Sequence, residues 1–498
     1  MPIPLNQKSL RLLSPAVAVP GHSRARGRRR IVHIGVGAFH RAHQAVYLDD
    51  LLANGQSGKW EICGAGLLEQ DRAIHRALSA QDCLYTVVEM SEAEPSARVV
   101  GPMAEHLYAP ESPEELLGRM ADAACAIVSL TITESGYLVN QWNGSFDFGH
   151  ADVRYDLEHP AEPSGWLGYV VEALDRRRGH GLPPFTVLSC DNLQHNGDVA
   201  RQAVLAFADR RDPSLARWLE AHGAFPNSMV DRITPVTTDA HRSMVADRFG
   251  ILDECPVVTE PFRQWVIEDR FADGRPEWER AGALLTSDVL PYEKIKIRLL
   301  NGGHQALCYL GLLVGFEYVH EAIADPQIAD FLRRLMREEI APLLVETPGI
   351  NLAEYQESVI RRFANPAIED RLSRIGADAS TRIAKFVMPS LAEQAARGGP
   401  MRLLTLAVAG WLRCLAGADE QGARIDLADP RGAALAALAR RTGPDPAPLL
   451  EVAEVFGGVL PADRRFRALL SEALRGLYND GARATLDAFL GRGAYQQE

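Results

Sequence analysis

The chain has few cysteines, and none of its seven cysteines forms a C-x-x-C pair with another. Their number is odd and they are widely spaced, a pattern that disfavours both a disulfide scaffold and closely spaced zinc ligands. Thiols used in this way are typical of small buried side chains in a reducing compartment. We therefore expect a cytoplasmic location.

A long apolar run is also missing. The most apolar helical segment, residues 403–415, is too short to span a membrane and contains Arg413. Residues 1–20 lack the basic start and the long apolar stretch of a signal peptide, because prolines divide their only apolar part. We expect neither a targeting segment nor a membrane partner.

Positive charge is not in excess, since 53 Lys and Arg residues stand against 65 Asp and Glu residues and give a net charge of −12. This balance disfavours general binding to nucleic acids. One basic cluster, Arg24, Arg26, Arg28, Arg29 and Arg30, fits either a phosphate or nucleic-acid patch or the solvated lead-in to a strand. Because nothing elsewhere extends the cluster, we favour the lead-in and expect no nucleic-acid partner.

The motifs of several enzyme classes are missing as well. The sequence has no G-x-S-x-G elbow and no P-loop lysine, which disfavours serine hydrolases and P-loop enzymes. Two histidines three residues apart, His40 and His43, do not complete a zinc ligand set. Neither do Cys190, Asp191 and His195. We expect no metal in the site.

The 498 residues, 47% of them hydrophobic and 24% charged, are typical of a globular chain of two or three domains. Short β-branched runs alternate with helical stretches in the first part of the chain, at residues 31–35, 61–65, 84–88, 125–132 and 185–190. Such runs are typical of strands buried on both faces of a parallel sheet. We predict an α/β fold in which residues 1–290 form a Rossmann-like, doubly wound, NAD-binding domain.

The spacing of apolar residues along the sequence changes near residue 291. Apolar residues then recur at steps of three and four, in the segments 331–344, 403–415, 431–441 and 466–478. This spacing predicts amphipathic or buried helices. We predict a mostly α-helical, substrate-binding domain over residues 291–498, with the active site in the cleft between the two domains.

A glycine-containing turn follows the first predicted strand and precedes a helical stretch. Glycines at this place let the backbone approach a pyrophosphate, whose charge a helix N-terminus then meets. The candidate cofactor-binding residues are Gly35, Gly37, Ala38, Phe39, His40 and Arg41. His40 stands where the usual G-x-G-x-x-G pattern has its third glycine, so an ordinary strand-to-helix turn is the alternative.

Two carboxylates, Glu69 and Asp71, follow the second predicted strand, where a ribose hydroxyl would be held. An acidic residue there repels a 2′-phosphate, so the sequence favours NAD as the cofactor and leaves NADP as the alternative. The same carboxylates also fit solvated loop charges or a helix N-cap.

Three segments, residues 131–136, 189–192 and 292–304, carry side chains suited to moving a proton and a hydride. If residues 292–304 form a regular α-helix with Lys296 at the origin, Glu293 lies at about 60°, His304 at about 80° and Asn301 at about 140°. These residues share one broad face, and Arg298, at about 200°, lies on the other side.

Oxidation of an alcohol needs a base for the hydroxyl proton and donors for the oxygen. A lysine in a dry cleft has a lowered pKa and suits the first role, and the neutral amides of asparagines suit the second. The alternative is structural: Lys296 with Glu293 in a surface ion pair, and Asn192 as a turn residue.

Six segments, residues 35–47, 129–137, 185–197, 225–235, 259–269 and 292–304, resemble the polyol-specific long-chain dehydrogenases and reductases, the mannitol dehydrogenase family. The likeness extends from residues 5–15 into the helical C-terminal part. The resemblance implies a metal-independent NAD enzyme that interconverts D-mannitol and D-fructose by hydride transfer at C2. Its partner would be a small polyol or ketose substrate, and we expect a monomer or weak oligomer.

The resemblance also assigns roles to individual residues. Lys296 would be the general acid and base, and Asn192 and Asn301 would hold the substrate oxygen. The remaining residues would position the substrate or relay the proton: His304, Asp231, Arg374 and Arg382 for positioning, and Glu134 and Glu293 for relay. Among the departures from the family's pattern are Lys294 and Gln70, together with Gln194, which replaces a proline, and Arg382, where a lysine is usual. Lys294 replaces a glutamate, which would lower the pKa of Lys296, and Gln70 replaces an acid beside Asp71, which weakens the exclusion of NADP.

Three other functions stay open. A fructuronate reductase (D-mannonate oxidoreductase) would need a cation for the substrate carboxylate, yet helix geometry points Arg298 away from Lys296, and Arg374 favours a polyol. A D-arabinitol 4-dehydrogenase differs by one carbon of the substrate. A nicotinamide-binding protein without turnover is disfavoured, because the lysine and both asparagines are present.

Overall fold

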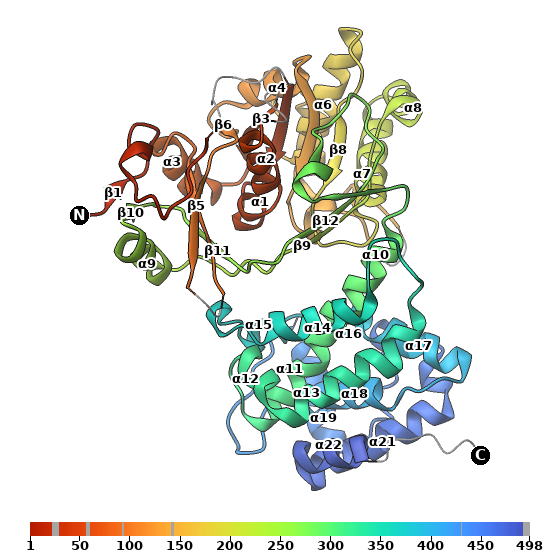
Figure 1. Ribbon diagram of the computed structural model, residues 1–498. Helices are drawn as coiled ribbons and strands as arrows, with labels where there is room; N and C mark the ends of the chain where they lie inside the picture. Colours follow the sequence, from red (N-terminus) through yellow and green to blue (C-terminus); the bar gives the residue numbers. More distant parts are fainter. Residues whose placement is uncertain (22–28, 56–59, 92–93, 141–143, 430, 492–498) are drawn as a thin grey trace. The chain divides into compact units, whose positions relative to one another are not determined.

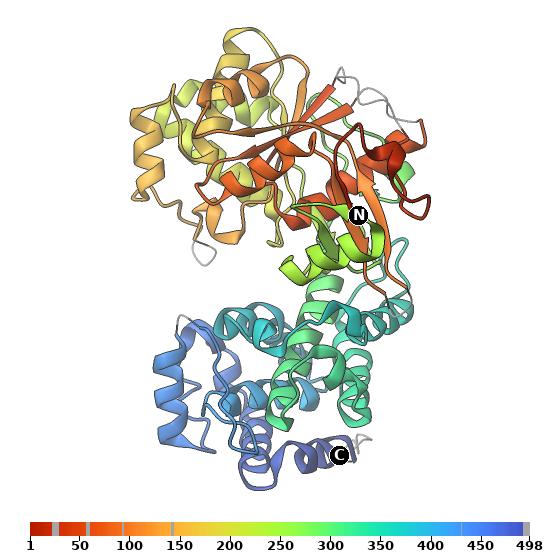
Figure 2. The same ribbon diagram turned by 90° about the vertical axis from the view of Figure 1, so that its left-hand side faces the viewer.

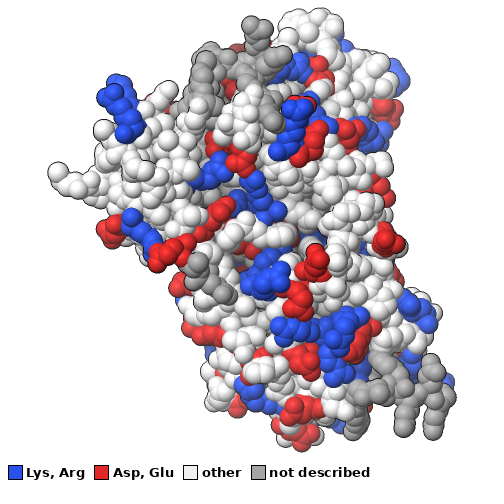
Figure 3. Space-filling model, viewed as in Figure 1, with Lys and Arg blue, Asp and Glu red and all other residues white. Residues whose placement is uncertain are grey.

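The computed structural model describes residues 1–21, 29–55, 60–91, 94–140, 144–429 and 431–491. The chain forms two compact units, Met1–Leu290 and Pro291–Glu498, and each is described by itself. Of the basic cluster, Arg24, Arg26 and Arg28 lie outside the described residues, and Arg29 and Arg30 begin a strand. On the face drawn in Figure 3, acidic and basic side chains are interspersed.

The first unit contains a five-stranded parallel sheet with the order β6-β3-β2-β7-β8 (Figure 1). Its strands are β2 (Arg29–Ile34), β3 (Trp60–Gly66), β6 (Met103–Tyr108), β7 (Cys125–Leu130) and β8 (Thr186–Ser189). Strand order runs outward from β2 on one side and from β7 on the other. The predicted Rossmann-like doubly wound sheet is therefore confirmed, with its topological switch point between β2 and β7.

Helices cover both faces of this sheet (Figure 1 and Figure 2). Val32 and Ile34 of β2 pack on the side of α4 (Pro113–Ala121), α6 (Trp166–Gly179), α7 (Asn196–Arg211) and α8 (Pro213–His222). Ile31 packs on the other side with α1 (Ala38–Ala42), α2 (Gln44–Ala53) and α3 (Asp71–Ala80). Because successive residues of β2 face opposite cores, its apolar residues Ile31, Val32 and Ile34 are buried on both faces of the sheet.

Three smaller sheets complete the first unit. β4 (Tyr85–Glu89) lies between β11 (Val257–Thr259) and β5 (Ser96–Val100), and β12 (Gln264–Glu268) lies between β13 (Leu284–Thr286) and β9 (Ser228–Asp231). A third sheet pairs β1 (Ile3–Pro4) with β10 (Ile251–Leu252). The assignment of residues 84–88 to the large parallel sheet was wrong, since β4 pairs antiparallel with β5 and parallel with β11.

The second unit is helical in its described part and has one continuous apolar core. The core surrounds α11 (Gly302–Val314), which packs against α18 (Arg402–Cys414), α12 (Val319–Ala324) and α13 (Pro326–Arg334). Further helices are α14 (Leu352–Phe363), α15 (Leu372–Ile375), α16 (Ala379–Phe386), α17 (Met388–Arg397), α19 (Gly432–Thr442), α21 (Arg464–Asn479) and α22 (Gly481–Gly491).

Two predicted helices are irregular. The segment predicted over residues 292–304 consists of α10 (Leu290–Ile295), the π-helix η4 (Lys296–Asn301) and the start of α11. The segment 331–344 similarly passes from α13 into the π-helix η5 (Leu335–Ile340) and the short helix η6 (Ala341–Leu343). Within the described ranges, no helix has the length and apolarity needed to cross a bilayer.

Candidate active site

A tight turn connects β2 to α1 at the carboxyl end of the sheet. Gly35 adopts a φ of +90°, and a Cβ atom on it would lie 2.1 Å from the carbonyl oxygen of Thr131. Only glycine fits here, for steric and conformational reasons alike. The Gly37 N–H donates to the Gly35 carbonyl at 2.7 Å, and Gly37 caps α1, whose first N–H groups have no acceptor within the helix.

Two side chains that follow this turn, those of His40 and Arg41, are buried in the first unit. His40 is 1% exposed and stacks on His33 with 3.4 Å between ring centroids. Arg41 is buried, and its guanidinium donates to the carbonyl oxygens of Gly37 and Cys255. The structure therefore directs both side chains into the unit, and it leaves Gly37 exposed, with Ala38 and Phe39 half-buried.

The two carboxylates past β3 have partners on this chain. Asp71 Oδ2 accepts the N–H groups of Leu67 and Leu68, each at 2.9 Å, and so shapes the loop at the strand end. Glu69 is exposed, pairs with Arg72 at 2.9 Å and accepts a hydrogen bond from Tyr108. The hydrogen bond from Arg72 lowers the pKa of the Glu69 carboxyl.

A buried carboxylate, Asp191, joins the loops that follow β7 and β8. It accepts the N–H groups of Ile132 and Thr133 at 3.1 and 2.9 Å and the hydroxyl of Tyr137 at 2.7 Å. Burial raises the pKa of Asp191. By holding this turn, Asp191 keeps the loop of Glu134 against the loop of its own neighbour, Asn192. The sequence placed Asp191 in the candidate segment 189–192 and among possible metal ligands, but it did not predict this structural role.

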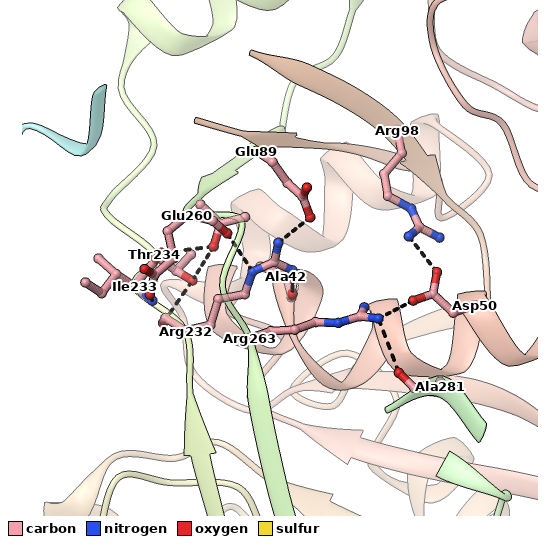
Figure 4. A network of polar contacts seen from close by, with 11 residues as sticks. Ala42, Asp50, Glu89, Arg98, Arg232, Ile233, Thr234, Glu260, Arg263 and Ala281 are labelled. Atoms are coloured by element: carbon pink, nitrogen blue, oxygen red, sulfur yellow. Dashed lines mark hydrogen bonds and ion pairs between the residues drawn. The ribbon is translucent and has the colours of Figure 1, made fainter. Parts of the chain in front are cut away.

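Asp231 is buried at the end of β9 and precedes Arg232, whose side chain is fully buried. Arg232 donates to Glu89 at 2.6 Å, to the Glu260 carbonyl at 3.0 Å and to the Ala42 carbonyl, the last of α1, at 2.5 Å. Figure 4 shows these bonds beside a second group in which Arg98 and Arg263 point toward Asp50. Arg232 thus ties the loop after Asp231 to the end of the helix that follows the glycine turn.

In the second unit, Lys296 begins the π-helix η4 and Asn301 ends it. The α-helical angles expected from the sequence are wrong for these two residues. A π-helix closes hydrogen bonds from residue i to i+5, so residues five apart lie about one turn apart and on the same side. Lys296 and Glu293 are 6% and 4% exposed, which excludes the solvated surface pair that was the alternative.

His304, one turn further on, stacks on Phe363 with 3.8 Å between ring centroids. Its buried Nε2 has no hydrogen-bond partner among the described residues. Burial, with the positive charges of Arg374, Arg362, Arg382 and Lys296, lowers the pKa of His304 well below 6.5. The ring is therefore neutral, and the second unit brings His304, Lys296 and two predicted arginines into one electrostatic neighbourhood.

The two predicted arginines have hydrogen-bond partners within the second unit. Arg374 forms two hydrogen bonds with Asp370, at 2.7 and 2.5 Å, and Arg382 donates to the carbonyl oxygen of Ile375.

The charges on the far side of η4 meet one carboxylate. Arg298 binds Glu393 of α17 at 2.8 Å, and Lys294 lies 3.3 Å from the same group. The charge of Lys294 is therefore compensated locally.

The candidate residues fall into two sets, one in each unit. Gly35, Glu69, Asp71, Glu134, Asn192 and Asp231 lie in the first unit with the rest of the glycine turn, and Glu293, Lys296, Asn301, His304, Arg374 and Arg382 lie in the second. That both sets line one cleft stays a prediction. Among the described residues, no three His, Cys, Asp or Glu side chains are grouped to hold a metal ion.

Two family models match this chain. The model of the mannitol dehydrogenase Rossmann domain matches residues 29–280, and that of the mannitol dehydrogenase C-terminal domain matches residues 288–478. Among similar proteins is a mannitol 2-dehydrogenase of Phaeosphaeria nodorum, 46% identical over 97% of this chain and 85% of its own length. The mannitol dehydrogenase DSF1 of Saccharomyces cerevisiae is 43% identical over 98% of this chain and 97% of its own.

Solved structures give the same result. Mannitol 2-dehydrogenase of Pseudomonas fluorescens, solved as a ternary complex with NAD and D-mannitol, is 42% identical with a TM-score of 0.88, over 98% of this chain and 100% of that one. A D-sorbitol dehydrogenase in substrate-free form is 37% identical with a TM-score of 0.91, over 97% of this chain and 100% of that one.

Proposed function

Because the chain belongs to the mannitol dehydrogenase family and is an oxidoreductase, we propose that it oxidises D-mannitol to D-fructose with NAD, reversibly and without a metal. The observation that carries this proposal is the buried Lys296 on a π-helix, in the electrostatic neighbourhood of the neutral His304. A lysine that is buried away from water can exchange a proton with a hydroxyl, and a neutral imidazole can hydrogen-bond to an uncharged sugar alcohol.

The first unit fits a dinucleotide. Gly35 lets the backbone turn tightly against Thr131, and the exposed Gly37, where a Cβ would have no heavy atom closer than 3.9 Å, leads into the free N–H groups of α1, where a pyrophosphate would lie. Asp71, at the end of β3, stands where a ribose hydroxyl would be held. When bound, NAD supplies a hydride acceptor. The carboxylate of Asp71 at this place disfavours the 2′-phosphate of NADP.

In the proposed reaction, Lys296 takes the proton of the C2 hydroxyl and returns it in the reverse direction. The amides of Asn192 and Asn301 donate to the C2 oxygen as negative charge develops on it. His304 offers Nε2 to a neighbouring hydroxyl, and Asp231, Arg374 and Arg382 position the rest of the polyol. Glu293 and Glu134 pass the proton onward from the lysine.

A uronate such as D-fructuronate or D-mannonate is a poorer substrate for this site. Its carboxylate would need an available cation, and Arg298, which was considered for that role, already binds a carboxylate, as does Arg374. Arg298 binds Glu393, and Arg374 binds Asp370. The paired charges therefore favour a neutral polyol, with D-arabinitol and D-sorbitol as the nearest competitors.

A substrate panel tests the proposal. NADH formation is followed at 340 nm with D-mannitol, D-arabinitol, D-sorbitol and D-mannonate, with NAD and NADP in turn. We expect the highest kcat/KM with D-mannitol and NAD, and activity that survives prior treatment with EDTA. A higher kcat/KM with D-mannonate would contradict the choice of substrate. No turnover with any of them, together with measurable NAD binding, would favour a binding protein.

A further inference from the structure

His33 lies on β2, two residues before Gly35, and is fully buried. Its Nδ1 lies 2.8 Å from the hydroxyl of Ser129, and its Nε2 lies 2.9 Å from the hydroxyl of Thr131. Nε2 is also 3.3 Å from the carbonyl oxygen of Gly35. One ring therefore contacts three groups around the glycine turn, a larger set than packing alone requires.

The strand register places this ring at the centre of the sheet. His33 is opposite Ser129 of β7 on one side and Gly64 of β3 on the other. The boundary between β2 and β7 is the topological switch point, outside which ligands of such sheets bind. His33 joins the two strands at this boundary through side chains, in addition to the backbone ladder.

The carbonyl of Gly35 is the point at which these contacts converge. It accepts hydrogen bonds from the Gly37 N–H at 2.7 Å and the Thr131 hydroxyl at 2.6 Å, in addition to the contact with His33. Gly35 has a φ of +90°, and its carbonyl is held both by the N–H of Gly37 in the same turn and by side chains of neighbouring segments. The turn is thus fixed before a ligand arrives, which reduces the ordering cost of binding.

The ring acts in its neutral form. Burial lowers the pKa of His33 to about 3, and its charged or titratable neighbours, His40 and His106, are themselves neutral because burial lowers their pKa values. A neutral imidazole has one donor and one acceptor. Because the Thr131 hydroxyl donates to Gly35, the Nε2–H of His33 is the donor toward Thr131 and Gly35, and Nδ1 accepts from the Ser129 hydroxyl. Ser129 also lies 2.9 Å from the side-chain amide of Gln44, which extends the network into α2.

We infer that His33 is a positioning residue for the cofactor: it fixes the Gly35 carbonyl and so preorganises the turn that binds the pyrophosphate of NAD. This inference rests on the proposed function, since it assumes that the turn binds a dinucleotide. His33 acts through the backbone of the turn and through Thr131, and it has no role in the transfer of the proton or the hydride.

Two substitutions test the contacts of the two nitrogens of the His33 ring separately. An asparagine amide reaches the place of Nδ1 and keeps the bond to Ser129, whereas a glutamine amide reaches the place of Nε2 and keeps the bonds to Thr131 and Gly35. In His33→Asn we expect the Kd for NAD and for ADP-ribose to rise about tenfold or more, the effect of one lost buried hydrogen bond. In His33→Gln we expect most of the affinity to return. In both, kcat at saturating NAD stays within about twofold of wild type, provided the fold is intact.

A second variant and a control keep the inference testable if His33 variants fold poorly. Thr131→Val is isosteric and removes the hydroxyl between Nε2 and Gly35, so it should weaken ADP-ribose binding by a similar factor. His106→Asn is the control, because His106 is also buried on a strand of the same sheet, β6, and its ring nitrogen Nδ1 bonds to His75 of α3. Its Kd for NAD should match wild type, even if its Tm falls.

Titration calorimetry with ADP-ribose and NAD, together with measurement of kcat and KM, tests the positioning role of His33. Unchanged Kd values in His33→Asn and Thr131→Val would overturn the inference, as would an equal loss in His106→Asn. Wild-type protein is titrated first. If wild type binds neither NAD nor ADP-ribose, the proposed function fails, and this outcome is distinct from a wild type that binds and variants that bind equally well.

Discussion

Lys296 is the residue on which the proposed proton transfer depends. Replacing it with alanine should lower kcat by about 10²–10⁴-fold, the usual contribution of a positioned base, while the Kd for NAD stays near the wild-type value. Lys294→Ala is the matched control, since Lys294 lies two residues away and binds Glu393. Steady-state kinetics across pH and NAD titration measure both. Near-normal kcat in Lys296→Ala would rule out its role as the base.

The choice between NAD and NADP is a second property of a single residue. Asp71→Asn keeps an oxygen that can accept the N–H groups of Leu67 and Leu68, but removes the charge that repels a 2′-phosphate. We expect the kcat/KM ratio of NADP to NAD to rise about tenfold, with the Tm little changed. Glu69→Gln, in which an exposed pair with Arg72 is lost, should change the ratio less. A constant ratio in Asp71→Asn would contradict the ribose assignment.

Several candidate site residues could be selected from the sequence because their chemistry is visible in it. The lysine, the asparagines and the glycines lie in short segments, and their roles stay predictions. Asp191, Arg232 and His33 were not assigned their roles, because each acts by hydrogen bonds to backbone or hydroxyl groups of distant segments. A single sequence shows the type of a buried polar residue, but not which strand end or loop its partner comes from.

At the scale of the element, the glycine turn gives a sharp contrast between two neighbouring positions. Gly35→Ala places a Cβ against the Thr131 carbonyl at a positive φ and should destabilise the first unit by about 2–4 kcal/mol. Gly37→Ala has no heavy atom closer than 3.9 Å and a φ of −85°, so its Tm should match wild type. Thermal unfolding by circular dichroism compares them. Equal Tm values would contradict the steric argument.

The sequence predicted elements well where their pattern was uniform and poorly elsewhere. β6 was missed because Glu105 and His106 interrupt its apolar run, although it lies in the central sheet. β4 was assigned to the central sheet because its residues are as apolar as those of the central strands. They are equally buried, but in another sheet. The π-helix η4 was read as an α-helix, because nothing in a local pattern distinguishes i+5 from i+4 hydrogen bonds.

At the scale of the whole molecule, the apolar cores of the two units contain separate residues. The core of the second unit consists of residues between 295 and 489, and those of the first unit lie between 5 and 283. The change from a mixed α/β unit to a helical unit at residue 291 could be predicted, because apolar residues are spaced differently in helices and in strands. The relation of the two units could not, since it depends on surfaces that have no periodic pattern.

These separate cores allow a pH effect to be assigned to one unit. Glu339 of η5 is 1% exposed, and burial raises its pKa to about 7, although it accepts the N–H groups of Leu403 and Leu404 at the start of α18. A raised pKa in the folded state means that the stability due to Glu339 is fully present below pH 4.5 and is lost as the pH rises to 7. The loss is about 3 kcal/mol.

Glu339→Gln should remove this dependence, so the fall in unfolding free energy of the second unit between pH 5 and pH 8 becomes smaller by about 3 kcal/mol. Glu338→Gln, its more exposed neighbour that pairs with Arg334 and Arg337, should keep the wild-type dependence. Urea unfolding at several pH values measures both. An identical pH dependence in wild type and Glu339→Gln would refute this assignment.

The extra residue per turn in η4 makes this segment intolerant of a change in length. Deleting any one residue between Lys296 and Asn301 would allow a regular α-helix to form, with better backbone hydrogen bonds than before. The same deletion would remove one side chain of the wide turn and leave Lys296 and Asn301 four residues apart in place of five, which changes the direction of one of them relative to the other. Homologous enzymes with the same chemistry should therefore vary in the loops around this segment and keep its residue count constant.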